Sequence, residues 1–535
     1  MGFTNDYMRS IQMKKTAHIL IILLFSSICV GATKYVATTG NDTTGDGSIG
    51  NPWLTIQYAF SQISTGDIIK VGAGTYLETT YNYLRLNRAI TATIESQSGS
   101  NDVYITPSST SYLILTYTAA GTFTLNNLTF RPTGASCSYL IYGAVNNYSL
   151  TFNNCVLDMD GKAGIILLNS AAGGTVIFNG CTIIADNCTT GYPTFYIISF
   201  NTIEVNDCDI TKSGGSVSIF GFSTSGTMLK IVDNTITSDA GVVNIGMGGA
   251  TDTLEHLIVT GNEVTGCAAF IYIVNEPVSF AEICGNTVTS SLVNTVFQIG
   301  LDSGTGTNIL SGFVIKNNML TKTSTAGHCI LLGTNCYGAE VSHNTFISTD
   351  ADDYGIVLKG CYNNVHHNIC KAANAMYISR GQYNKVRYNT CYAIGGYCFG
   401  WFVQDTTNPV KNVITNNIFD ASGGGQYAMY DLNMDAHYDN YIDYNCYKTG
   451  SSAVARLADT NYDTIATLTA KWTAWSDVWP GNDAHSIIAD PQFMSVANNN
   501  FKLRYNSPCL NTGEDTLQDG QTSIGAWQRR SIFPF

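Results

Sequence analysis

The residues of this chain best suited to proton transfer are a lysine and an arginine that share one local pattern. The segments KGCYNNV and RGQYNKV align on Val365 and Val386 and place Lys359 and Arg380 at the same position of two successive copies. A guanidinium beside an ammonium favours release of the lysine proton, whereas the arginine stays charged. We therefore predict Lys359 as a general base and Arg380 as its electrostatic partner. The alternative is two solvated side chains that align by chance.

The stretch around this pair also offers groups that bind sugars. Aromatic rings stack on sugar rings, and imidazole and guanidinium groups hydrogen-bond to hydroxyls and carboxylates. The predicted substrate-binding residues are Tyr354, Tyr362, Tyr377, Tyr383, His366 and Arg387. The competing interpretation is that the tyrosines are ordinary strand formers and the charged groups are solvated corner residues.

These side chains meet only if the chain repeats, and a short template does recur. It is an apolar residue, two polar residues, a small or amide residue, one further residue and an apolar residue, as in FNNCVL from Phe152 and VRYNTC from Val386. From Leu128 onward, the fourth positions follow one another at similar intervals, each the length of one short repeat. After Leu128 they are Cys155, Cys181, Cys208, Asn234, Asn262, Asn286, Asn318, Asn344, Asn368, Asn389, Asn417 and Asn445.

This unit is too short for a helical hairpin with its own core, and it is rich in Val, Ile, Thr and Tyr. It fits one turn of a coil of short strands, stacked at about 4.8 Å per turn. At a sharp corner of such a coil, an inward Asn satisfies backbone groups and bonds the Asn above and below. We therefore predict an internal asparagine ladder that continues into stacked cysteine thiols; a bridge between adjacent cysteines is the alternative.

The repeat resembles the right-handed parallel β-helix of the pectate-lyase-like superfamily. The opening YVATTGNDTTGDG from Tyr35, which leads to GTYLE, is similar to the start of secreted β-helix proteins. The resemblance implies an all-β fold, a right-handed single-stranded parallel β-helix over residues 33–448. A short helix from Ile56 to Ile63, with Thr55 as N-cap, is expected to close its first turn.

The rhythm changes after Tyr447, where we expect a C-terminal cap in residues 449–535. Ile465, Leu468, Trp472 and Trp475 recur at helical spacing and predict an amphipathic helix there.

The stretch from Lys359 to Arg380 resembles the catalytic coils of the chondroitinase-B and alginate-lyase family, in which a lysine and an arginine occupy successive turns. The resemblance implies Lys359 as the base and Arg380 as the partner of the substrate carboxylate or leaving group. The acidic pair that holds Ca²⁺ in that family is partly matched by Asp352 and Asp353, which predicts Ca²⁺ as a cofactor. The family's Asn-Gly-Glu segment is not found in this sequence.

Charge and targeting signals restrict the partners. The formal net charge is −13 and there is no basic run, which argues against nucleic acid. From Met13 a basic start is followed by a short apolar run and small residues, so residues 1–32 are predicted to be a secretory signal, too short to span a membrane. We expect a secreted protein, extracellular or periplasmic, that acts on a polysaccharide as a monomer.

Three functions remain open at this point. The first is a polysaccharide lyase that cleaves a uronic-acid polymer by β-elimination. The second is a non-catalytic glycan-binding or structural β-helix protein, and the third is a glycoside hydrolase with two outward carboxylates on adjacent turns. The fold alone does not choose among them.

Overall fold

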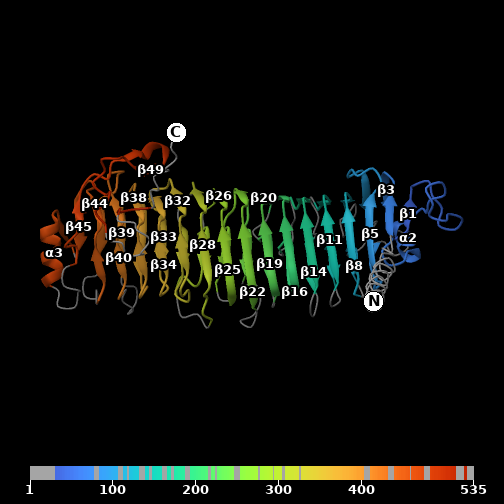
Figure 1. Ribbon diagram of the computed structural model, residues 1–535, viewed down its shortest axis with the longest axis horizontal. Helices are drawn as coiled ribbons and strands as arrows, with labels where there is room; N and C mark the ends of the chain where they lie inside the picture. Colours follow the sequence, from blue (N-terminus) through green and yellow to red (C-terminus); the bar gives the residue numbers. More distant parts are fainter. Residues whose placement is uncertain are drawn as a thin grey trace, which may run out of the picture.

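The computed structural model describes most of the chain as one long coil of strands (Figure 1). The described residues are 31–77, 84–106, 112–116, 120–131, 139–143, 148–159, 165–169, 174–186, 193–214, 218–222, 226–245, 253–274, 277–292, 295–303, 308–323, 327–402, 410–431, 439–457, 459–474, 482–513 and 523–526. Most of the predicted signal segment, residues 1–30, lies outside them.

Each turn of the coil contributes a strand to each of three parallel sheets, which we call sheets I, II and III. In the part that carries the candidate residues, sheet I contains β27 (Phe297–Ile299), β30 (His328–Leu332), β33 (Tyr354–Leu358), β36 (Asn374–Ser379), β39 (Tyr397–Phe402), β42 (Tyr427–Asp431) and β45 (Ala453–Leu457). Sheet II contains β31 (Glu340–Ser342), β34 (Asn364–His366), β37 (Lys385–Arg387), β40 (Val413–Thr415) and β43 (Tyr441–Asp443). Sheet III contains β32 (Thr345–Ser348), β35 (Ile369–Ala372), β38 (Thr390–Ala393), β41 (Ile418–Asp420), β44 (Cys446–Lys448) and β47 (Ile487–Ile488).

Successive strands within each sheet are parallel and in register. Val341, Val365, Val386 and Ile414 are consecutive partners on sheet II, and all four side chains are buried in the interior. The predicted parallel β-helix is therefore confirmed by the strand topology. The coil extends slightly past residue 448, because β45 pairs with β42 and β47 pairs with β44.

The predicted asparagine ladder forms the corner between sheets II and III. From Asn234 to Asn445 each Asn is buried, and the backbone N–H and Nδ2 of one donate to Oδ1 of the next; from Asn389 to Asn417 the distances are 2.9 and 3.1 Å. Ser486 ends the ladder by accepting from Asn445 N at 2.9 Å. Toward the N-terminus Cys155, Cys181 and Cys208 continue the column as unbridged, buried thiols.

A second amide column, which the template did not predict, lies at the corner between sheets I and II. Backbone N–H of Asn363 donates to Oδ1 of Asn384, that of Asn384 to Asn412, and that of Asn412 to Asn440, at 2.8 to 2.9 Å. All four side chains are buried. Each precedes a ladder residue by the length of one short strand, so two internal amide columns fix both ends of each sheet II strand in this region.

Helices cover the two ends of the coil (Figure 1). Helix α2 (Ile56–Gln62) begins after Thr55, whose hydroxyl accepts from Tyr58 N at 3.2 Å, as predicted. Helix α3 (Ile465–Ala474) buries Leu468 and Trp472 against the last turns. Trp475 lies outside the described residues.

The C-terminal segment then returns along sheet III, above β44 and β38 in Figure 1. Phe493, Phe501 and Ile524 pack against Tyr392 and Ile418 of the coil, so this segment covers part of sheet III. In the region that carries the candidate residues, polymer access is therefore better on sheets I and II.

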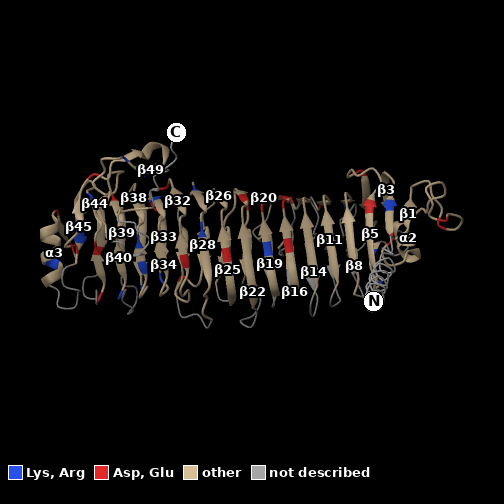
Figure 2. Cartoon of the chain, viewed as in Figure 1, with Lys and Arg blue, Asp and Glu red and all other residues tan. Residues whose placement is uncertain are grey.

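Charged residues are sparse on the face seen in Figure 2, where single basic and acidic residues occupy neighbouring strands. Lys230 pairs with Glu204 at 3.2 Å in this way, and Lys70 with Glu95 at 2.6 Å. Within the described residues no helix has the length and apolar character that crossing a membrane requires.

Candidate functional site

Lys359 lies immediately after β33, at the end of a sheet I strand. Its side chain is 7% exposed, and Nζ donates to the Asp302 carboxylate at 2.6 Å and to the Asp302 carbonyl at 2.9 Å. Asp302 belongs to the loop that follows β27, two turns earlier, and its side chain is 56% exposed. The predicted base is thus held as a hydrogen-bond donor by a carboxylate that faces solvent.

Arg380 does not occupy the position equivalent to Lys359. Leu358 pairs with Ile378 and Val365 pairs with Val386, so the second copy is one residue longer between these points. Arg380 supplies the extra residue, with a left-handed φ of 62°.

Arg380 and Asp302 nevertheless both influence the pKa of Tyr377 on β36. Burial raises the pKa of Tyr377; the Asp302 carboxylate adds to this shift and the Arg380 guanidinium opposes it. The arginine and the carboxylate that holds Lys359 therefore belong to the same region of sheet I.

His328, at the start of β30, is a further member of this region. Burial lowers the pKa of His328 to about 4, with the Asp302 carboxylate opposing this shift and the Lys359 ammonium adding to it. Its imidazole is therefore neutral near pH 7. Its ring packs edge-on against Tyr354 at 5.4 Å.

Tyrosine rings continue from this point across sheet I toward the C-terminus. Tyr354 and Tyr377 have centroids 5.6 Å apart, and Tyr397 stacks on Tyr430 at 5.2 Å. Tyr430 also stacks on Tyr427 at 5.6 Å. We call these five residues the tyrosine row; it spans the strands from β33 to β42 and ends beside Arg456, whose Nη1 donates to the Tyr427 hydroxyl at 3.3 Å.

A glycine makes the middle of the tyrosine row flat. Gly400 of β39 pairs with Tyr377 on one side and Tyr430 on the other. The Tyr397 ring lies over Gly400, close enough that a Cβ added at Gly400 would come within 2.4 Å of Tyr397 Cε2. The row is therefore continuous where a side chain at position 400 would interrupt it.

The other two predicted tyrosines lie elsewhere, at the corner between sheets I and II. Tyr362 and Tyr383 both have left-handed φ values, and their rings stack on each other at 4.7 Å with only 2° between their planes. Lys411 lies 5.4 Å from the Tyr383 centroid and covers the free end of the stack. Both tyrosines are exposed, at 57% for Tyr362 and 37% for Tyr383, but they lie apart from Lys359 and Arg380 on another part of the surface.

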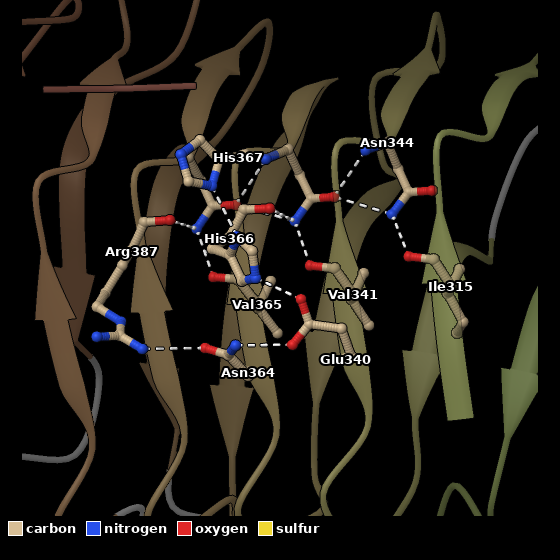
Figure 3. A network of polar contacts seen from close by, with 11 residues as sticks. Ile315, Glu340, Val341, Asn344, Asn364, Val365, His366, His367 and Arg387 are labelled. Carbon is tan, nitrogen blue, oxygen red and sulfur yellow. Dashed lines mark hydrogen bonds and ion pairs between the residues drawn. The ribbon is translucent and has the colours of Figure 1, made fainter. Parts of the chain in front are cut away.

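His366 and Arg387 belong to a third group, on sheet II (Figure 3). His366 Nε2 contacts the Glu340 carboxylate, and His366 Nδ1 lies 2.7 Å from His367 Nδ1. Asn364 connects Glu340 to Arg387: its Nδ2 donates to the Glu340 carboxylate at 2.7 Å, and its Oδ1 accepts from Arg387 Nη2 at 3.2 Å. Burial alone would raise the pKa of Glu340, but its contacts with His366 lower it below the usual value.

Asp352 and Asp353 do not form one acidic pair. Asp353 is fully buried and accepts from Lys322 Nζ at 2.8 Å and Ser348 Oγ at 2.7 Å. Asp352 is exposed. Among the described residues no three His, Cys, Asp or Glu side chains are arranged to hold a metal ion. These two residues do not fit a shared Ca²⁺ site, and a requirement for Ca²⁺ stays a prediction.

Comparison with known proteins gives no family assignment. No family model and no curated protein matches the chain. Thirteen chains of solved structures match. They include the complex of XylC with xylose, with 11% identity, TM-score 0.31 and coverage of 86% of this chain and 87% of that one. Pectate lyase Pel9A has 11% identity and a TM-score of 0.21, and the match covers 95% of this chain and 98% of that one. GH136 lacto-N-biosidase from Eubacterium ramulus has 11% identity and a TM-score of 0.25, and the match covers 86% of this chain and 67% of that one. At these values the likeness does not bear on activity.

The structure thus brings Lys359, Arg380, Tyr354 and Tyr377 to sheet I and separates the remaining predicted residues from them. Sequence reasoning missed Asp302, because it lies two turns before Lys359, in a loop outside the repeated template. It also missed Tyr430, which lies in the same register column as Tyr377 and Gly400, and Tyr397, which pairs with Tyr427 on the next strand.

Proposed function

We propose that the protein is a secreted polysaccharide lyase that binds a uronic-acid polymer along sheet I and cleaves it by β-elimination. One observation supports this above all: Lys359, Arg380 and the tyrosine row lie on consecutive turns of the same sheet. A linear polymer needs such an extended surface, and its carboxylates need local positive charge on a chain of net charge −13.

In the proposed reaction Lys359 takes the proton beside the sugar carboxylate, and Arg380 stabilises the negative charge that develops on that carboxylate. The electron pair of the broken C–H bond forms the new double bond, the C–O bond to the leaving sugar breaks, and the glycosidic oxygen takes up a proton from solvent water. Asp302 opposes the first step, because its carboxylate and carbonyl oxygens both accept hydrogen bonds from Lys359 Nζ. The substrate therefore has to displace Asp302 before Lys359 can act as a base.

The test is absorbance near 235 nm during incubation with pectate, alginate and glycosaminoglycans, with Ca²⁺ and with a chelator, since elimination creates a conjugated double bond. Lys359→Ala is expected to lower kcat about 10³-fold, within the range of general-base catalysis. Lys385→Ala, an exposed lysine on sheet II, is the control and is expected to retain activity. Retained activity in Lys359→Ala would refute the assignment of the base.

The second candidate function is glycan binding without catalysis, which the Lys359–Asp302 ion pair favours. It predicts that uronate polymers bind without a gain in absorbance and without new reducing ends. New reducing ends without a gain in absorbance would indicate a glycoside hydrolase instead.

A further inference from the structure

A depression on sheet I lies N-terminal to Lys359. It is a shallow pocket of about 190 Å³, and its floor includes three consecutive register partners: Asn244 of β21 (Val243–Ile245), Tyr272 of β24 (Ile271–Ile273) and Gln298 of β27. Gly241, Ala268 and Ala269 line one side, and these small residues leave room beside the Tyr272 ring.

The chemistry of this pocket differs from that around Lys359. Among the described residues, its lining contains amides, hydroxyls, one tyrosine and small apolar residues, but no Lys, Arg, Asp or Glu. Tyr272 is 37% exposed, so part of its ring is available for stacking. Amide groups provide both donors and acceptors, which suit sugar hydroxyls, whereas nothing in this lining compensates the charge of a carboxylate.

The pocket lies in the same register column of sheet I as Tyr377 of the tyrosine row, and the two residues between Gln298 and Tyr377 in that column, Leu331 and Val357, are buried. Gln298 pairs with Leu331, Leu331 with Val357, and Val357 with Tyr377. Tyr272 and Tyr377 are therefore four strand spacings apart, about 19 Å at about 4.8 Å each. One polymer chain that runs along sheet I and passes over the residues that cover Leu331 and Val357 would reach both places.

We propose that the pocket at Asn244, Tyr272 and Gln298 is a subsite for an uncharged pyranose. Together with the cationic region at Lys359 and Arg380, it selects a polymer that carries neutral sugars and uronic acids a few sugar units apart, in preference to a pure polyuronate. This inference rests on the proposed function for the placement of the uronate, but not for the binding of the neutral sugar.

The experiment uses the full-length protein and titrates two sets of probes by calorimetry: neutral oligosaccharides (xylo-, galacto- and gluco-oligosaccharides) and oligogalacturonate or oligoalginate. Tyr272→Ala and Gln298→Ala are expected to weaken neutral binding at least tenfold and to leave uronate binding within twofold. Tyr104→Ala, which removes a tyrosine of the same 37% exposure from sheet III, is expected to change neither. Melting curves of all variants check that each is folded.

The outcomes separate the two proposals. If no neutral oligosaccharide binds, or if Tyr272→Ala binds them as well as the unaltered protein does, the subsite is refuted, even when uronate polymers are cleaved. If neutral oligosaccharides bind through Tyr272 and no polymer gives the 235 nm product, the subsite stands and the lyase proposal fails. Loss of neutral and uronate binding together in Gln298→Ala, with an unchanged melting curve, would also overturn the idea of a separate neutral subsite.

Discussion

The residue just before each ladder position turns the chain from sheet II into sheet III. It is left-handed in successive turns, with φ of 55° at Asp233, 57° at His343, 55° at His367 and 55° at Tyr388. Asn and Gly tolerate this conformation best, and they fill the position in other turns. His343, His367 and Tyr388 instead stack on one another, at 4.9 and 5.1 Å between centroids. Contacts between turns therefore help to hold bulky side chains in this backbone conformation.

The ladder residues themselves make a contribution to stability that can be measured. The Asn389 side chain donates to the carbonyls of Val365 and Arg387, and its Oδ1 accepts from the backbone and side chain of Asn368. Asn389→Ala leaves these buried groups without partners, so the free energy of unfolding is expected to fall by about 2–4 kcal/mol. Urea unfolding measures it.

The control for this prediction is an amide on the outside of the coil. Asn153 lies in an outward column, donates to Asn126 Oδ1 at 2.9 Å and is partly exposed. Water replaces its partners, so Asn153→Ala is expected to cost about 0.5 kcal/mol. Equal costs for Asn389→Ala and Asn153→Ala would contradict the view that the internal ladder satisfies otherwise buried backbone groups.

At the scale of elements, the sequence predicted the coil because one amide per turn recurs and the spacing excludes helices. It did not predict the strand register around Lys359 and Arg380 with the same success. Aligning KGCYNNV with RGQYNKV assumes that neighbouring turns match position for position. Paired residues of β33 and β36 are nevertheless one position closer together in the sequence than paired residues of β34 and β37. A single left-handed residue, Arg380, absorbs the difference. Local conformation of this kind leaves no trace in a hydrophobic pattern.

The tyrosine row makes a prediction that belongs to strand β39. Gly400→Ala places a Cβ where the Tyr397 ring now lies, 2.4 Å from Cε2, so the ring has to leave its stack with Tyr430. Binding of a uronate polymer is expected to weaken about tenfold, with a loss of stability of about 1 kcal/mol. Affinity electrophoresis in a gel that contains the polymer measures the first, and thermal melting the second.

Gly72→Ala is the matched change, because its added Cβ meets neighbours only at ordinary contact distances of 3.4 Å or more. It is expected to leave binding unchanged. If Gly400→Ala also binds as well as the unaltered protein, the polymer does not lie on the tyrosine row.

At the scale of the whole molecule, the stacking of turns has two consequences: an extended binding surface, and a risk that copies of the protein assemble end to end. Columns of outward side chains run the length of the coil, which suits a linear polymer. The same regularity leaves an unpaired set of strand edges at each end, where another copy could add. At the C-terminal end β46 (Thr460–Tyr462) turns back antiparallel on β45, and α3 covers the interior through Leu468 and Trp472.

Detaching this cap is expected to make copies of the protein assemble end to end. Leu468 is fully buried and contiguous with the core of the coil, so Leu468→Asp places a charge there and lifts α3 from the end. The far-UV circular dichroism of the strands should persist, because each turn depends mainly on its neighbours, while sedimentation velocity should show species that grow with concentration. Ala470→Asp adds the same charge to an exposed position of the same helix and should sediment like the unaltered protein. A Leu468→Asp variant that stays folded and does not assemble at high concentration would show that α3 is not what protects this end of the coil.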